Sequence, residues 1–225
     1  MSRRALIEHR PWLLASLVAA TSYFFLADET VPGLYAMVWK GLGVGFLALY
    51  ALLRGRGGVD GTLIALAMAL CATADMVLEF SFLAGGAIFA VGHVVAIWLY
   101  LRNRRADPVV SQRLAGLALL IVTPVLAALL TYPLANWQMA SAYALVVGAM
   151  AAAAWTSRFP RYRVGLGAVL FVVSDLVIFA REAGRMDPDL AGWLVWPLYY
   201  AGQLMIVTGV VQTLRRDRAG NTHRG

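Results

Sequence analysis

Residues 163–180 read RVGLGAVLFVVSDLVIFA, a run in which Asp175 is the one charge after the opening Arg163. A helix needs about 20 mostly apolar residues to cross a bilayer, so this run predicts a membrane-spanning helix with a carboxyl group inside it. The whole chain has the same character. Of its 225 residues 61% are hydrophobic and 14% are charged, whereas a soluble domain carries about 25% charged residues. This composition excludes a water-soluble globular protein, a disordered chain and a disulfide-stapled secreted module.

Similar apolar runs occur along the whole chain. Together with 163–180 they are residues 12–27, 34–53, 61–80, 84–101, 113–131, 136–155 and 192–214. We therefore expect an all-α polytopic membrane protein, a bundle of about eight transmembrane helices that forms a single domain over residues 1–225. The loops are too short to hold a soluble catalytic domain, so any chemistry must come from side chains on the helices. The first run ends at Ala27-Asp28-Glu29 without a convincing cleavage site, which indicates a retained span.

Arginine residues gather in alternate loops of this predicted bundle. One side carries Arg3, Arg4, Arg10, Arg54, Arg56, Arg102, Arg104, Arg105, Arg113, Arg158, Arg161, Arg163, Arg215, Arg216, Arg218 and Arg224. The loops of the other side carry Asp28, Glu29, Glu182, Asp187 and Asp189, with Arg181 and Arg185 for balance. The positive-inside rule then places both termini in the cytoplasm, in a multi-pass protein of the cell (plasma or inner) membrane. Because this bias explains the net charge of +7, we expect no nucleic-acid partner.

Few ionisable groups remain inside the predicted spans: Lys40, Asp75, Glu79, His93 and Asp175. An ionised side chain at bilayer depth costs about 2.5–3.5 kcal/mol or more, so such groups face a cavity or one another. The predicted helix directions put all of them in the outer half of the bundle. Three further side chains join this layer: Tyr199, Tyr200 and Gln203. Spacings of four residues, as from Asp75 to Glu79, favour a pocket lined by paired rows.

Most of these side chains also have a purely structural interpretation. Lys40 could extend to the outer interface, Glu79 could be interfacial, and His93 could be a core histidine bonded to a backbone carbonyl. An aromatic belt could include Tyr199 and Tyr200, although Trp193 and Trp196 are better placed for one.

The two aspartates are harder to explain structurally, because each lies among small or apolar residues. Their segments, Ala74-Asp75-Met76-Val77 and Ser174-Asp175-Leu176-Val177, also resemble each other. Both lie on spans predicted to run in the same direction, which would fit a parallel internal repeat of four helices.

The sequence predicts no metal centre and no cofactor. Of the three histidines, His9 and His223 lie in the tails, and the single cysteine, Cys71, lies in an apolar run, so a zinc site is not expected. A Mg²⁺ or Ca²⁺ site built from Asp75, Glu79 and Asp175 stays open. The chain has no Gly-x-Ser-x-Gly motif, which argues against a serine lipase.

Several blocks of residues match a known family. They are Asp75 and Leu78; Phe82, Gly85, Phe89 and His93; Tyr143, Met150 and Ala154; residues 167–175, which follow the pattern GAxLFxxSD; and residues 199–203, which follow YYxxQ. Through these blocks, from Lys40 to about Ile206, the chain resembles the YhhN family of eight-span membrane proteins, whose characterised members are lysoplasmalogenases. It departs from the family at Gly41, Ala74 and Ala96, where Pro, Gly and Tyr are usual.

The resemblance implies hydrolysis of the vinyl-ether bond of a lysoplasmalogen, a lysophospholipid reached from the bilayer. Cleavage by protonation needs a proton donor, a negative charge near the resulting cation and a base for water. Two carboxyl groups in different environments can divide these tasks, so we predict Asp75 and Asp175 as the catalytic acid/base pair. We expect the substrate to be bound by Lys40, Glu79, His93, Ser174, Tyr199, Tyr200 and Gln203.

The rival interpretation is a proton-coupled transporter of a small molecule or lipid, because buried carboxyl groups and a lysine also mark ion pathways. Pro124 and Pro197 could break helices, as carriers often require. Against a transporter, the ionisable groups lie in one predicted layer and do not extend across the membrane. A third interpretation is a scaffold whose buried charges only set helix pairing.

Overall fold

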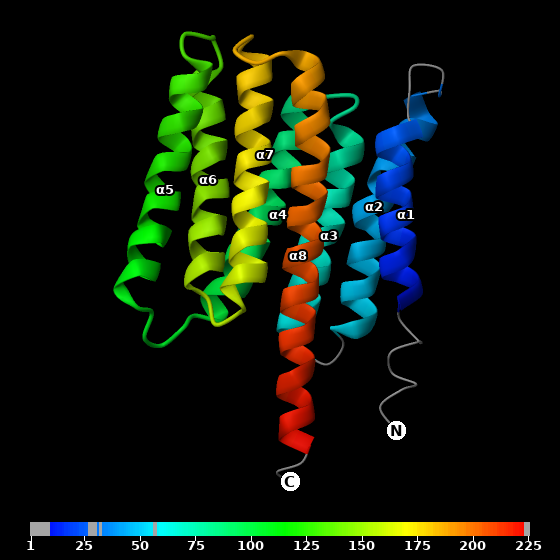
Figure 1. Cartoon of the computed structure of the whole chain (residues 1–225), viewed down its shortest axis with the longest axis vertical. Coiled ribbons are helices and arrows are strands. Elements are labelled where there is room, and N and C mark those ends of the chain that lie inside the picture. Colours follow the sequence, from blue (N-terminus) through cyan, green and yellow to red (C-terminus); the bar gives the residue numbers. More distant parts are fainter. Residues whose placement is uncertain (1–9, 27–30, 32, 56–57, 223–225) are drawn as a thin grey trace. The chain divides into compact units, whose positions relative to one another are not determined.

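The structure, a computed structural model, describes residues 10–26, 31, 33–55 and 58–222. Its helices are α1 (Arg10–Leu26), α2 (Gly33–Arg54), α3 (Val59–Val77), α4 (Phe82–Arg102), α5 (Val110–Thr131), α6 (Trp137–Thr156), the π-helical turn η2 (Arg161–Gly165), α7 (Leu166–Glu182) and α8 (Pro188–Thr222) (Figure 1). Seven stretches among the described residues are long and apolar enough to cross a membrane, and α1 is a shorter apolar helix. The predicted all-α polytopic membrane fold is confirmed.

Helices suit this composition because a bilayer offers no hydrogen bonds to the backbone, so each span must satisfy its own N–H and C=O groups. Pro124 in α5 and Pro197 in α8 both lie within continuous helices. The breaks that the sequence suggested at these two prolines are therefore not present. Some charged and ionisable residues used in the sequence argument lie outside the described residues: Arg3, Arg4, His9, Asp28, Glu29, Arg56, His223 and Arg224.

The chain forms two compact units: residues 1–95 with 210–225 (unit 1), and residues 96–209 (unit 2). In unit 1, α2 packs between α1 and α3 (Figure 1). The Ser16 hydroxyl on α1 donates a 2.6 Å hydrogen bond to the Gly43 carbonyl on α2. On the other side, α2 approaches α3 at Gly41, where an added Cβ would meet the flexible Met76 side chain. Small residues thus bring these apolar helices close together.

Unit 2 contains α5, α6, η2, α7 and the first part of α8. Helix α6 contacts both α5 and α7 (Figure 1), and a small core forms around Ala127, Ala144 and Phe179. Helices α7 and α8 meet backbone to backbone: a Cβ at Gly167 would lie 2.7 Å from the Gly202 carbonyl oxygen. This contact sets the position of the α7 segment that carries Asp175.

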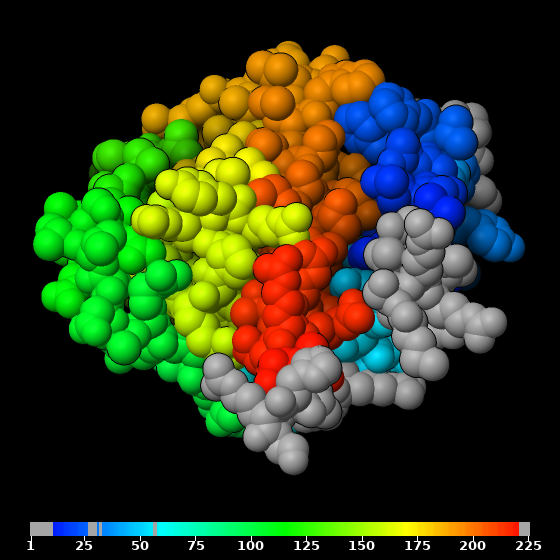
Figure 2. All heavy atoms as spheres, turned by 60° about the horizontal axis from the view of Figure 1, so that its bottom comes forward, coloured from blue at the N-terminus to red at the C-terminus, as the bar shows by residue number. Residues whose placement is uncertain are grey.

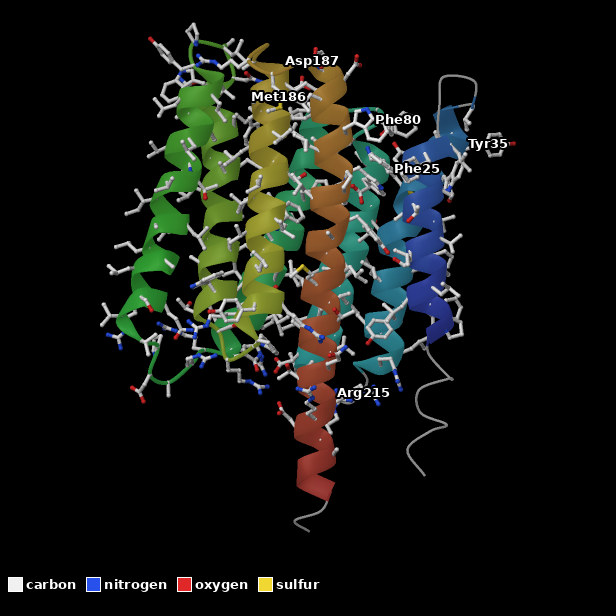
Figure 3. The ribbon with its side chains drawn as sticks, in the orientation of Figure 1. Phe25, Tyr35, Phe80, Met186, Asp187 and Arg215 are labelled. Atoms are coloured by element: carbon white, nitrogen blue, oxygen red, sulfur yellow. The ribbon has the colours of Figure 1, made fainter. Side chains whose placement is uncertain are left out.

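The charged loops of unit 2 lie at two separate ends. At one end the loops before α5 and before α7 are joined, because Arg158 donates from its backbone and side chain to Asn103, at 2.8 and 2.7 Å. Figure 2 brings this end forward, with the α6–α7 loop in yellow-green. At the other end lie Met186 and Asp187 (Figure 3). The separation fits the predicted topology, and the cytoplasmic location of the basic end stays a prediction.

Candidate functional site

In unit 1, an ion pair joins two of the predicted binding residues. Lys40 Nζ on α2 lies 2.6 Å from Glu79 Oε1, just after the end of α3. The Lys40 side chain is 18% exposed and that of Glu79 is 41% exposed. Phe80, next in sequence to Glu79, lies with Phe25 at the same end of this unit (Figure 3). The pair therefore stands near the C-terminal end of α3, with the Glu79 carboxylate half-exposed and the Lys40 side chain largely buried.

Asp75 lies one helical turn before Glu79 and is 2% exposed. It interacts electrostatically with Lys40, so a buried carboxyl group acts on the ammonium group as well as the half-exposed one of Glu79. The structure thus brings together three of the predicted site residues, Lys40, Asp75 and Glu79.

Tyr23 on α1 belongs with Lys40, Asp75 and Glu79, although it was not predicted from the sequence. It is half-buried and interacts electrostatically with Lys40, Asp75 and Glu79. Its ring meets Trp39 edge to face at 6.4 Å, and the Trp39 indole donates a 3.0 Å hydrogen bond to the Ser22 hydroxyl. The aromatic contacts hold Tyr23 toward α2. A tyrosine near a span end is also typical of an aromatic belt, so its sequence position carried no specific signal.

His93 on α4 is 3% exposed and stacks on Phe89, with ring centroids 6.2 Å apart and planes 17° apart. The spacing of four residues places the two rings on one face of the helix. This contact accords with the core-histidine interpretation, and a role in substrate binding stays a prediction.

In unit 2, Asp175 on α7 accepts a 3.1 Å hydrogen bond from the Tyr143 hydroxyl on α6. Tyr143 is itself held by Phe179, whose ring it meets edge to face at 6.1 Å. From the sequence, Tyr143 was only a loose family match without a role. Its partner could not be foreseen, because the contact depends on how α6 packs against α7.

Ser174 precedes Asp175 and is 1% exposed. Its hydroxyl donates a 3.0 Å hydrogen bond to the Val195 carbonyl on α8. Ser174 therefore ties α7 to α8 next to the aspartate. The expected contact with substrate stays a prediction.

The tyrosines of α8 lie inside the protein. Tyr199 and Tyr200 are 5% and 8% exposed. Tyr199 meets Phe171 of α7 edge to face at 5.2 Å, and Trp196 stacks on Tyr200 with ring planes 16° apart. Trp196 is 8% exposed, whereas Trp193 is 62% exposed. The aromatic-belt interpretation thus suits Trp193 but is wrong for Trp196, because Trp196 turns inward onto the two tyrosines.

Gln203 lies one turn after Tyr199 and is 1% exposed. Its side-chain Nε2 is buried and makes no hydrogen bond to any residue within the described ranges. Leaving such a donor unsatisfied costs about 1–3 kcal/mol. A buried amide of this kind is suited to a water molecule or a polar group of a ligand.

The two predicted catalytic residues belong to different units, Asp75 to unit 1 and Asp175 to unit 2. Their action as a pair stays a prediction. Among the described residues, no group of three or more His, Cys, Asp or Glu side chains could hold a metal ion. The carboxylate-only Mg²⁺ or Ca²⁺ site left open by the sequence therefore gains no support.

Comparison with known proteins gives one result. The sequence profile of the YhhN family matches residues 35–210, which is most of the chain and includes the candidate site residues. Neither the curated proteins nor the solved structures give a significant match.

Proposed function

Because the chain belongs to the YhhN family, we propose that it is a membrane-embedded hydrolase that cleaves the vinyl-ether bond of lysoplasmalogens. The products would be a fatty aldehyde and a glycerophospho-base. One observation carries the proposal: a membrane helix of each unit bears a carboxyl group that polar side chains hold in place. Asp75 interacts with Lys40, and Asp175 is hydrogen-bonded to Tyr143.

The chemistry is acid-catalysed addition of water. A carboxylic acid transfers its proton to the β-carbon of the vinyl ether, and the electrons of the double bond form the new C–H bond. The positive charge is then shared by the α-carbon and the ether oxygen, where a carboxylate stabilises it. Water adds to the α-carbon and gives up a proton to a carboxylate. The resulting hemiacetal breaks its C–O bond to release the aldehyde and the glycerol hydroxyl.

In this proposal Asp75 and Asp175 divide the acid and base steps. Lys40 binds the substrate phosphate. The buried Gln203 amide, with Tyr199 and Tyr200, orients water or the glycerol hydroxyl. The apolar side chains of the spanning helices accept the alkenyl chain, which enters from the bilayer. We further propose that the protein resides in the plasma or inner membrane.

Aldehyde release from a lysoplasmalogen by the purified protein in detergent tests the proposal. Wild type is compared with Asp75→Asn and Asp175→Asn, each checked for folding by size exclusion. Asp189→Asn is the matched control, because Asp189 is an exposed aspartate in the first turn of α8. We expect activity in wild type and in the control and nearly none in the other two variants. Folded wild type that releases no aldehyde from either the ethanolamine or the choline form contradicts the proposal, and transport assays on the same variants would follow.

A further inference from the structure

The ion pair between Lys40 and Glu79 presents a cation and an anion side by side near the C-terminal end of α3. The nitrogen and oxygen are 2.6 Å apart, and the Glu79 side chain is 41% exposed. Lys40 is largely buried and Glu79 is half-exposed, so the Glu79 carboxylate is the member of the pair that a ligand reaches first. A ligand that carries both charges could replace the internal contact, because it offers each side chain an opposite charge.

We propose that Lys40 and Glu79 together recognise a zwitterionic phosphoethanolamine head group. The phosphate takes Lys40 Nζ as its partner, and the ligand's ammonium group takes the Glu79 carboxylate. This inference rests on the proposed function for the identity of the lipid. It goes further by assigning the head group and by giving Glu79 a role in selectivity.

The depth of Asp75 supports this orientation of the lipid. Asp75 lies in the last turn of α3 and Glu79 just beyond the helix end, which separates them by one helical turn, about 5–6 Å along the axis. The glycerol backbone separates the phosphate from the vinyl ether by a comparable length. A head group held at half-exposed Glu79 would thus direct the reactive bond to the level of Asp75, which is 2% exposed, and the alkenyl chain further into the apolar helices.

The chemistry of the two common head groups predicts a preference. A primary ammonium donates N–H hydrogen bonds to a carboxylate, and such charge-assisted bonds are short and strong. The trimethylammonium of choline has no N–H group, and its methyl groups keep the two charges apart. Glu79 therefore favours ethanolamine over choline, whereas Lys40 binds the phosphate that both lipids share.

Equilibrium binding of two lysophospholipids with a saturated ether chain tests this assignment. One carries ethanolamine and the other choline, and their dissociation constants are measured by tryptophan fluorescence on the full chain in detergent. We expect wild type to bind the ethanolamine lipid about tenfold more tightly. In Glu79→Gln the ratio of the two dissociation constants should fall to about one. The choline lipid should bind to this variant as well as to wild type or better, because Lys40 loses a competing carboxylate. Lys40→Met should weaken the binding of both lipids by a similar factor.

The matched control is Glu182→Gln. Glu182 forms an exposed ion pair with Arg181 at 2.8 Å in unit 2, so its loss should leave the head-group ratio unchanged. Glu79→Asp keeps the carboxylate and should keep a preference for ethanolamine, which tests the inference even if Glu79→Gln does not fold. A full ethanolamine preference in folded Glu79→Gln, or a ratio near one in wild type, overturns the inference.

The saturated ligands separate this inference from the proposed function, because they bind without being cleaved. Binding that follows the predicted pattern without aldehyde release from a true vinyl ether would support the head-group site and refute the hydrolase. Aldehyde release together with a head-group ratio that does not depend on Glu79 would support the hydrolase and refute the head-group site.

Discussion

The segment Ala74-Asp75-Met76-Val77 on α3 and the segment Ser174-Asp175-Leu176-Val177 on α7 are alike in sequence, yet their aspartates have different partners. Asp75 interacts electrostatically with Lys40, whereas Asp175 accepts a hydrogen bond from the Tyr143 hydroxyl. The internal repeat suggested by the two segments does not extend to these partners. A short sequence pattern can therefore indicate a carboxyl group within a membrane helix, but the partners of that group depend on which helices pack beside it.

The same two helices also differ in how they pack. Near Asp75, α2 approaches α3 closely at Gly41, and the movable Met76 side chain occupies the space between them. In the first turn of α7, Gly167 faces the backbone of Gly202 on α8. The α2–α3 contact at Gly41 can therefore adjust to a small added group, whereas the α7–α8 contact at Gly167 cannot do so without a shift of the backbone.

The largest expected effect comes from removing both carboxyl groups. Asp75→Asn and Asp175→Asn should each lower kcat by about 10²–10⁴-fold, the usual contribution of acid–base assistance. If both groups serve one reaction, the kcat of the double variant should be only slightly lower than that of the less active single variant. The measurement is kcat for aldehyde release from all four proteins. Losses that multiply would show that the two aspartates act independently.

The second prediction concerns the packing difference. Gly202→Ala puts a Cβ 2.6 Å from the Gly167 carbonyl oxygen, which cannot move without separating α7 from α8. Overpacking of this kind costs about 1–3 kcal/mol, so the melting temperature should fall clearly. Gly41→Ala, whose Cβ would meet Met76 Cγ at 2.6 Å, should lower it much less, because that side chain can turn away. Equal losses in the two variants would remove the distinction between the two contacts.

Tyr143→Phe tests the hydroxyl that holds Asp175. Loss of one net hydrogen bond of about 0.5–1.5 kcal/mol should lower kcat about two- to tenfold with little change in KM, because the carboxyl group loses its orientation. Steady-state kinetics give both constants. Tyr162→Phe is the control, since Tyr162 is 73% exposed. A change in KM alone, or the same change in the control, would show that Tyr143 does not position Asp175.

The smallest effect is expected from Glu79→Gln on stability. The Glu79 carboxylate is half-exposed, and an ion pair with an exposed partner contributes about 1 kcal/mol or less, so the melting temperature should match that of Glu182→Gln, which removes the exposed pair at Arg181. A large drop confined to Glu79→Gln would show that the pair with Lys40 mainly holds α2 to α3, and would weaken its assignment to the head group.

Much of the fold could be predicted because a helix that crosses a bilayer needs a long run of apolar residues. The run 163–180 corresponds to α7, Leu166–Glu182. The end of α8 was predicted less well: the predicted run stops at residue 214, but the helix continues to Thr222. Hydropathy marks only the apolar part of a helix, and beyond it Arg215 and Arg216 continue the helix as polar residues. The π-helical turn Arg161–Gly165 likewise has no apolar pattern of its own.

The candidate site was predictable where the residue type itself is unusual in a membrane span. Lys40, Asp75 and Glu79 were identified because charges in apolar runs are costly, and the structure places them together. Tyr23 and Tyr143 were missed as partners, because tyrosine is common in such helices and its hydroxyl contacts depend on tertiary packing. The inward turn of Trp196 was missed for the same reason.

The central claim is that a proton is added to the β-carbon of a vinyl ether, and hydrolysis in deuterated water tests it most directly. Aldehyde released at early times should carry one deuterium on the carbon next to the carbonyl, as measured by mass spectrometry. The same aldehyde incubated with Asp75→Asn should show how much label arises by exchange alone. Labelled product above that background is the predicted result. Aldehyde with no label above background, or no aldehyde from the folded protein, would contradict the account.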